Sequence, residues 1–375
     1  MEHTNIPLLG RLYRMMPALC LLALFPSCSS EEHGAAEAGL NAHPLQFYIT
    51  LADYNGGSVT RGALLSSLDE SIGMSAFSYS AAEEWNEGLR PEYFYNEEVF
   101  NNEDRWLTSG AYTPPAVGSK MRVFAYYPFV DTEDAEAYAA SPLQLSGADV
   151  QGTPFLTYTV PDLVEQQTDL MAGCTSELVI AADNEAALPL TVSHLLSGVQ
   201  LVAGAVPASE HGTITAVTLR GVWGKGTYTY DQGWELLRYD PETDYHDYSQ
   251  PLNFIMDGTT GRIINDDEAT FLMLPQQLPA DAVLEVSYQC GGSTHTLTHS
   301  LNGKEWKQGR IARYIVNIES LQRMTLTEQI VDWDEGFTMV DGRSTSHAVV
   351  DNTANLNDWD GTDGDNNPLD QSLSN

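Results

Sequence analysis

The clearest pattern in the chain is an alternation of apolar and polar positions near residue 45. The apolar positions are Leu45, Phe47, Ile49 and Leu51, and polar or small residues come between them. Successive side chains of a strand point to opposite faces, so this period predicts a half-buried β-strand. The Asn-Gly-Gly-Ser sequence at 55–58 predicts the loop that ends it.

Short strand patterns recur along the rest of the chain, separated by turns rich in Gly, Pro and Asp. The expected strands are 75–79, 93–95, 120–128, 155–160, 199–203, 213–220, 227–230, 254–256, 271–274, 283–290, 294–301, 313–318 and 326–333. Helical periodicity is nearly absent: only 193–199 could form a turn or two, and 130–150 is expected to be a loop. Many short strands predict an all-β fold built from β-sandwiches.

The length of 375 residues allows two domains with sizeable cores. Residues 181–188 have no strand pattern and are the expected boundary, which divides an N-terminal domain (45–184) from a C-terminal domain (185–336). The segment 337–375 has seven Asp and one Arg. This composition predicts a mobile acidic tail.

The N-terminal segment has the pattern of an export signal. Arg11 and Arg14 precede an apolar run at 17–25 that is too short to span a bilayer. Cys28 follows the small residue Ser27, an arrangement that resembles bacterial lipoprotein signals. The expected signal peptide is therefore 1–27, with a lipid such as palmitate on Cys28 and a tether at 28–44. Ordinary secretion, with Cys28 as a bystander, is the alternative.

The net negative charge of the chain argues against several classes of binding partner. The chain has 52 acidic and 17 basic residues and a formal charge of −35, which disfavours nucleic acid, anionic membrane surfaces and phosphate-rich substrates. After processing, Cys174 and Cys290 are the remaining cysteines; they could pair, or Cys290 could be a buried thiol on a strand face.

Catalytic and metal-binding patterns are weak. The sequence has no G-x-S-x-G, no H-E-x-x-H and no paired C-x-x-C. A catalytic triad from Asp341, Ser346 and His347, or a calcium site at Asp358, Asp360, Asp363 and Asp365, would lie in the polar tail. Metal ligands at 240–247 are better explained as a loop. His194 as a ligand, and Trp85, Trp223 and Trp234 as sugar-stacking residues, are better explained as core or sheet-face residues. We expect no enzyme activity, no cofactor and no metal.

Several short motifs together resemble the fimbrillin family, the lipoprotein-derived subunits of type V pili of Gram-negative bacteria. They run over about residues 45–335 and comprise Tyr93–Val99 followed by Trp106 and Tyr112, Val123–Pro128, Gln167–Ala172, Leu190–Val199, Leu272–Gln276, and Trp306–Arg310 before Tyr314. The resemblance implies two tandem β-sandwich domains of transthyretin-like, Greek-key type, with no cofactor. It also implies a subunit at the cell surface, attached to the outer membrane by its lipid.

The resemblance implies a route of assembly as well. In such pilins a trypsin-like protease cuts after an arginine, the first strand leaves, and a strand of a neighbouring subunit fills the groove. In this chain the matching scissile bond is Arg61-Gly62. The removable strand is Leu45 to Asp53, and its buried side chains are Leu45, Phe47, Ile49 and Leu51. The expected donor strand lies within 326–350. Arg61 could instead be a plain loop arginine, because some members are not cut.

The sequence therefore leaves two functions open. The first is a pilus subunit in a stalk, tip or anchor position, with other pilin subunits and a surface receptor as partners. The second is a surface lipoprotein that does not polymerise and binds a glycan or a host protein.

Overall fold

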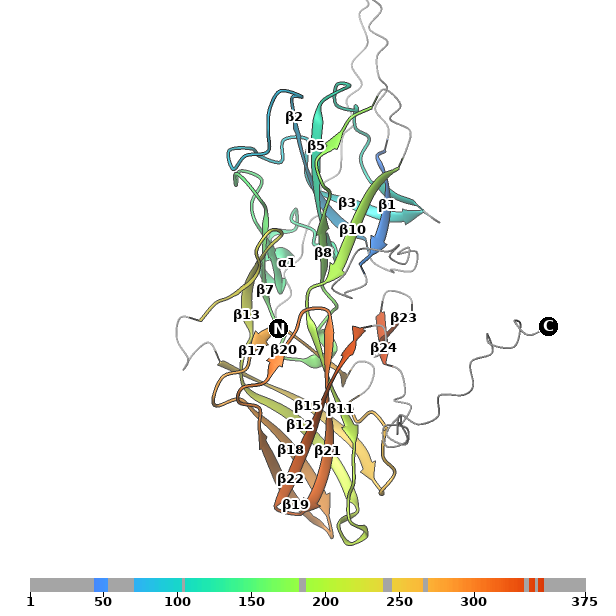
Figure 1. Cartoon of the computed structure of the whole chain (residues 1–375), viewed down its shortest axis with the longest axis vertical. Coiled ribbons are helices and arrows are strands. Elements are labelled where there is room, and N and C mark those ends of the chain that lie inside the picture. The colour runs from blue at the N-terminus through green and yellow to red at the C-terminus, as the bar shows by residue number, and fades with distance from the viewer. Residues whose placement is uncertain are drawn as a thin grey trace, which may run out of the picture. The chain divides into compact units, whose positions relative to one another are not determined.

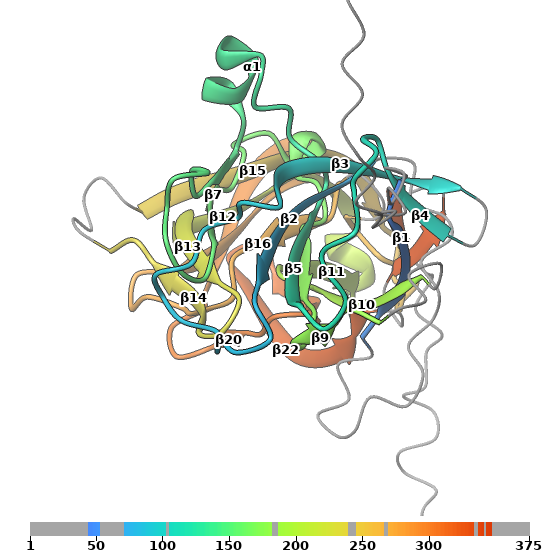
Figure 2. The ribbon, with the colours of Figure 1, turned by 90° about the horizontal axis from the view of Figure 1, so that it is seen from above.

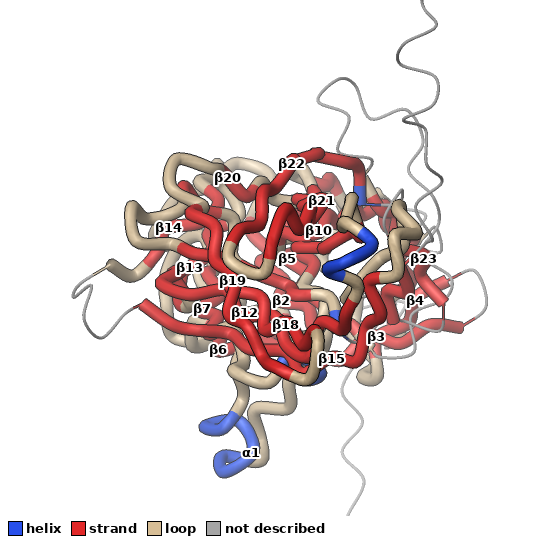
Figure 3. Tube along the Cα trace, turned by 90° about the horizontal axis from the view of Figure 1, so that it is seen from below, coloured by secondary structure: helices blue, strands red, loops and turns tan. Residues whose placement is uncertain are grey.

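The computed structural model describes residues 44–52, 71–102, 105–181, 187–238, 245–265, 269–333, 337–340 and 343–346 (Figure 1). Strands make up most of this part of the chain, as the red segments of Figure 3 show. The all-β class predicted from the sequence is confirmed. Among the described residues, no helix is long and apolar enough to cross a membrane.

An eight-stranded sheet forms the N-terminal region. Its strands are β1 (Gln46–Leu51), β2 (Ile72–Tyr79), β3 (Phe94–Asn102), β4 (Arg105–Thr108), β5 (Lys120–Tyr127), β8 (Met171–Cys174), β9 (Leu178–Val179) and β10 (Leu188–His194). The hydrogen-bonded order is β2-β3-β4-β1-β10-β8-β5-β9, and β2 also pairs with β5. These pairings close the strands from β2 round to β5 into a ring (Figure 2).

One apolar cluster lies within this ring. Alternate residues of β5 contribute to it as the sequence predicts: Met121, Val123, Ala125 and Tyr127 are all buried there. Residues of β1, β2, β3, β4, β8 and β10 complete it. The ring therefore depends on the inward-facing side chains of nearly every strand, including β1.

The C-terminal region contains two further four-stranded sheets. The first has the order β16 (Phe271–Met273), β11 (Ser197–Ala203), β21 (Arg310–Ser320) and β22 (Arg323–Asp332); the second has the order β15 (Tyr245–Met256), β12 (Gly212–Trp223), β18 (Val283–Cys290) and β19 (Ser293–Ser300). Their buried residues belong to a single larger apolar cluster. The strand predicted at 283–290 has the same bounds in the structure.

A small sheet joins segments from the two halves of the chain. Its order is β14 (Gly233–Leu236), β13 (Lys225–Thr229), β7 (Phe155–Thr159) and β6 (Leu143–Leu145). Strand pairing thus crosses the expected boundary at 184/185, and β10 pairs with β1 and β8 of the N-terminal ring. The division into two domains at that position stays a prediction.

Two local predictions are wrong. Residues 193–199 form no helical turn: β10 ends at His194 and β11 begins at Ser197, because each segment finds strand partners far along the chain. Residues 130–150 are not all loop, since they include α1 (Ala135–Ala140) and β6. Asp134 caps α1 by accepting hydrogen bonds from the backbone N–H groups of Glu136 and Ala137.

The remaining elements are short. They are η1 (Val164–Gln166), η2 (Ala208–Glu210), the pair β17 (Gln276–Gln277) and β20 (Glu305–Trp306), and the antiparallel pair β23 (Phe337–Val340) and β24 (Arg343–Ser346). The last pair lies within the segment expected to be a tail. Most of 337–375, with the proposed triad residue His347 and the acidic calcium candidates, lies outside the described residues.

Candidate functional site

The first strand, β1, is held between two strands that lie far from it in the sequence. It runs parallel to β10, from Phe47 opposite Leu188 to Leu51 opposite Val192. On its other side it is antiparallel to β4, where the paired positions are Gln46 with Leu107 and Phe47 with Trp106. Figure 1 shows β1 alongside β10.

Hydrogen bonds fix both ends of β1. At its start, the Leu45 N–H donates to Thr108 Oγ1 (2.9 Å), and the Thr108 N–H donates back to the Leu45 carbonyl (3.1 Å). At its end, the Ala52 N–H donates to the Val192 carbonyl (2.8 Å). The register of β1 is therefore set at both ends by β4 and β10.

The two faces of β1 differ in burial. Phe47 and Ile49 are 0% exposed and Leu45 is 8% exposed, and all three belong to the cluster inside the ring. Leu51 is half-buried and packs against the same cluster. On the outer face Gln46 is exposed and Tyr48 is 45% exposed. The predicted alternation is confirmed.

The apolar surface beneath β1 comes from the rest of the ring. Its buried members include Ile72, Met74, Val99, Trp106, Val123, Met171, Leu190 and Val192. Tyr93 packs at its edge, where burial raises the pKa of its hydroxyl to about 12. Without the β1 side chains, this surface would face solvent between β4 and β10.

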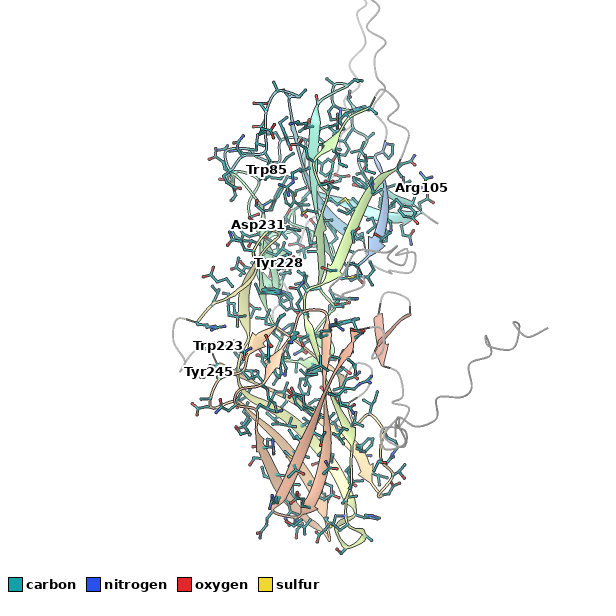
Figure 4. All side chains as sticks on the ribbon, viewed as in Figure 1. Trp85, Arg105, Trp223, Tyr228, Asp231 and Tyr245 are labelled. Carbon is teal, nitrogen blue, oxygen red and sulfur yellow. The ribbon has the colours of Figure 1, made fainter. Side chains whose placement is uncertain are left out.

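Polar contacts of β1 lie on its outer face. The hydroxyls of Thr50 and Thr191 are 3.1 Å apart, and Arg105 Nη1 donates to Gln46 Oε1 (3.1 Å). Figure 4 labels Arg105 on its strand. These contacts are partly or fully exposed, so they add specificity of register more than stability.

The predicted lipidation and cleavage residues, Cys28, Arg61 and Gly62, lie outside the described part of the chain, as do residues 240–244 of the loop considered for metal binding. Within the described ranges, no group of three His, Cys, Asp or Glu side chains is placed to hold a metal ion. Asp247 instead accepts a hydrogen bond from Arg220 (2.7 Å).

His194 is a core histidine, as predicted. Its Nδ1 lies 2.7 Å from Asp169 Oδ2, and both side chains are buried. The Trp333 ring stacks on the imidazole at 4.4 Å with an interplanar angle of 18°. These contacts connect β10 to Trp333, the residue that directly follows β22.

The tryptophans considered for sugar binding pack mainly within the protein. Trp223 is 7% exposed and lies 4.3 Å from Tyr245, and Trp234 donates its Nε1–H to the Leu195 carbonyl (2.8 Å) (Figure 4). Trp85 is half-buried, and Arg122 stacks on its ring. Their aromatic faces are therefore largely engaged.

The two cysteines in the described ranges are free thiols. Cys290 is buried on the same strand face as Leu284, Val286 and Tyr288, as predicted, and Cys174 is half-buried. The Cys290 thiol donates to the His211 carbonyl (3.3 Å).

Comparison with solved structures identifies the class of protein that has this fold. A fimbrial protein from Bacteroides vulgatus superposes with a TM-score of 0.57 at 17% identity, covering 77% of this chain and 99% of that one. A candidate cell adhesion protein from Bacteroides ovatus superposes with a TM-score of 0.53 at 16% identity, covering 78% and 98%. The chain therefore has the all-β fold seen in these proteins.

Sequence comparison then gives the family. A family model described as fimbrillin-like matches residues 67–333, which is more than half of the chain. The chain belongs to the fimbrillin-like family, as the motifs predicted. Membership associates it with fimbriae. No curated protein sequence matches it.

Proposed function

We propose that this chain is a structural or adhesive subunit of a type V pilus, exported as a lipoprotein and assembled by exchange of β1. The observation that carries the proposal is the position of β1. It fills the gap between β4 and β10 with fully buried Phe47 and Ile49, and it precedes the segment 53–70 that contains Arg61-Gly62. A cut after Arg61 would leave β1 held only by noncovalent contacts.

The energy of those contacts explains why an empty groove must be refilled. Each of Leu45, Phe47 and Ile49 would lose about 1.5 to 3 kcal/mol of burial. Each main-chain hydrogen bond adds about 0.5 to 1.5 kcal/mol. The total, on the order of 10 kcal/mol, is comparable with the whole stability of a domain. A strand from a neighbouring subunit that fills the same groove would recover it by strand addition.

The donor strand is expected within residues 326–350. The first part of this range lies in β22, which pairs with β21 from Arg323 to Asp332. The next part forms β23, whose pairing partner within the described ranges is β24. Three of its four residues, Phe337, Met339 and Val340, are apolar. We therefore propose β23 as the donor, with its hairpin opening to enter a neighbour's groove beside β10.

Export and anchoring complete the proposal. Residues 1–27 act as a signal peptide, Cys28 carries the lipid in the outer membrane, and 28–44 is a tether. The two apolar clusters support a tandem arrangement of two β-sandwich domains. The closed ring of strands fits this arrangement, because a ring around one apolar cluster is equivalent to two packed sheets joined at their edges. The proposal covers a stalk, tip or anchor position.

Cell-surface assembly of matched variants tests the proposal. Arg61→Ala should leave a lipidated precursor that does not enter detergent-resistant oligomers, because the scissile bond is lost. Arg90→Ala, which changes an exposed arginine outside the helices and strands, should assemble like the wild type. Unchanged assembly of Arg61→Ala would favour the second function, a monomeric surface lipoprotein that binds a glycan or host protein.

A further inference from the structure

A pocket of about 650 Å³ lies on the N-terminal half of the chain, away from β1. Its walls are formed by residues 128–131 after β5, residues 137–143 from α1 to β6, and residues 166–170 after η1. Tyr158 of β7 contributes to the same lining. The volume falls in the range of roughly 300–1,000 Å³ that is typical of small-molecule sites.

Side-chain amides fix all three walls of this pocket. In the first wall, Asn96 donates to the Val130 carbonyl (2.9 Å), and in the second, Gln144 donates to the Ser141 carbonyl (3.0 Å). In the third, Gln167 donates to the carbonyl of Pro161, which precedes that wall (3.0 Å). Gln167 is buried and also accepts the Leu272 N–H (2.8 Å), which ties the third wall to β16. The pocket is therefore preformed, so binding would cost little ordering of the chain.

The lining has the chemistry of a site for an uncharged ligand. Phe129, Val130 and Pro142 supply accessible apolar surface, and Gln166 and Thr168 supply amide and hydroxyl groups. None of the lining residues is a lysine or arginine, and the single charged one is Asp131. Because the whole chain also has a formal charge of −35, an anionic ligand would be repelled.

Tyr158 is the buried aromatic residue of the lining. The residue is 3% exposed, and its hydroxyl has no hydrogen-bond partner. Burial, and then the nearby charge of Asp169, raises the pKa of this hydroxyl, so it stays protonated. The hydroxyl oxygen is itself buried, so Tyr158 shapes the wall of the pocket and does not offer a hydrogen bond to a ligand there.

We propose that this pocket binds a neutral sugar residue at the end of a glycan. The ring of Phe129 and the side chain of Pro142 pack against the C–H face of the sugar. Gln166 and Thr168 exchange hydrogen bonds with its hydroxyl groups. A sugar combines these two kinds of surface, whereas a charged peptide or a phosphate would place charge in a lining that has no cation to meet it.

This inference deepens the adhesive part of the proposed function and rests on its cell-surface location. It does not depend on strand exchange, because no residue of β1 lines the pocket. A sugar-binding measurement on purified monomer therefore fails or succeeds independently of the Arg61→Ala assembly test.

The test uses two substitutions on one short helix. Ala137 and Ala139 are both exposed residues of α1, and only Ala137 lines the pocket. Ala137→Trp should fill the pocket and lower affinity more than about tenfold, whereas Ala139→Trp should leave affinity unchanged. Thr168→Val removes one hydroxyl at constant shape and should lower affinity about three- to tenfold, as expected for one hydrogen bond.

The probes are galactose, mannose, glucose, fucose and N-acetylglucosamine, measured against the purified full chain by saturation-transfer NMR and titration calorimetry. At least one neutral sugar should bind, and the same sugar capped with sialic acid should bind at least tenfold more weakly because of its charge. Binding of none of the five would overturn the proposal. Equal loss of affinity in Ala137→Trp and Ala139→Trp, or preference for the sialylated form, would overturn it as well.

Discussion

Strands β1 and β11 occupy corresponding positions in the two regions of the molecule. β1 is parallel to β10 along its length and antiparallel to β4 near its start. β11 is parallel to β21 from Gly198 to Ala203 and antiparallel to β16 near its start. Each is the first strand of its region, and each lies between two strands that come later in the chain.

The two strands differ in how they are buried. All seven residues of β11 are buried, so both of its faces are covered. β1 is buried on one face, and its other face carries the exposed Tyr48. β11 also follows β10 after only two residues and leads into β12, whereas β1 is followed by a segment that contains Arg61.

This comparison explains why only one of the two strands is a candidate for exchange. A strand buried on both faces cannot leave without exposing two apolar surfaces and a core. A strand buried on one face can be replaced by any segment with the same alternation. We expect β11 to be a permanent part of its sheet and β1 to be a replaceable part of the ring.

The largest expected effect is in β11. Leu201→Asp places an unpaired charge among fully buried residues and should lower the free energy of unfolding by more than about 4 kcal/mol. Urea unfolding followed by tryptophan fluorescence would measure it. A Leu201→Asp protein as stable as the wild type would contradict the expectation that β11 is a permanent part of its sheet.

Phe47→Ala is the corresponding change in β1. The side chain is 0% exposed, so its loss should cost about 3 to 5 kcal/mol in the uncut chain. In a chain cut after Arg61, the same substitution should make β1 dissociate more readily, which size-exclusion chromatography of the released peptide would detect. The Leu201 variants should show no such release, and identical behaviour of the two strands after cutting would contradict the comparison.

Thr50→Val should have a smaller effect on the same strand. It removes the contact between the hydroxyls of Thr50 and Thr191 and should cost about 0.5 to 1.5 kcal/mol. Tyr48→Ala, on the exposed face, should stay within about 0.5 kcal/mol of the wild type. Urea midpoints of the two variants give the comparison, and a larger loss of stability in Tyr48→Ala would mean that Tyr48, and not Thr50, makes the stronger contact on the outer face.

Alkaline pH should weaken both regions modestly. Burial raises the pKa of Tyr93, beside the ring, and of Tyr288, in β18, to about 12. A tyrosine in the unfolded chain has a pKa of about 10. The folded state therefore holds these protons more tightly, so the stabilisation is complete below pH 10 and is lost as the pH rises toward 12.

Replacing either residue by Phe should make stability less dependent on pH in that window. Urea unfolding at pH 9 and at pH 11.5 would measure the difference for Tyr93→Phe and Tyr288→Phe. A steeper loss of stability in either variant would show that the sign of this effect is wrong.

The inward-facing residues of β1 could be predicted from the sequence because they depend on local alternation alone. The same holds for β18 and for the buried face of β5, where period-two patterns stand between clear turn signals. For such strands the local pattern and the three-dimensional environment agree.

The partners of β1 could not be predicted in this way. β10 begins with Leu188 and Pro189 beside a segment that resembles a linker, and its place next to β1 depends on pairing across about 140 residues of sequence. β4 is only four residues long. The segment 193–199 could locally form helical turns, but pairing of Gly198 with Ile311 and of His194 with Met171 overrides that preference.

The N-terminal residue of chains taken from assembled fimbriae tests the central claim most directly. N-terminal sequencing combined with mass spectrometry of detergent-resistant oligomers from intact cells would identify it. If β1 is replaceable, assembled chains begin at Gly62 and lack the residues from Leu45 to Leu51. Assembled chains that begin at an acylated Cys28 and keep β1 would contradict the account.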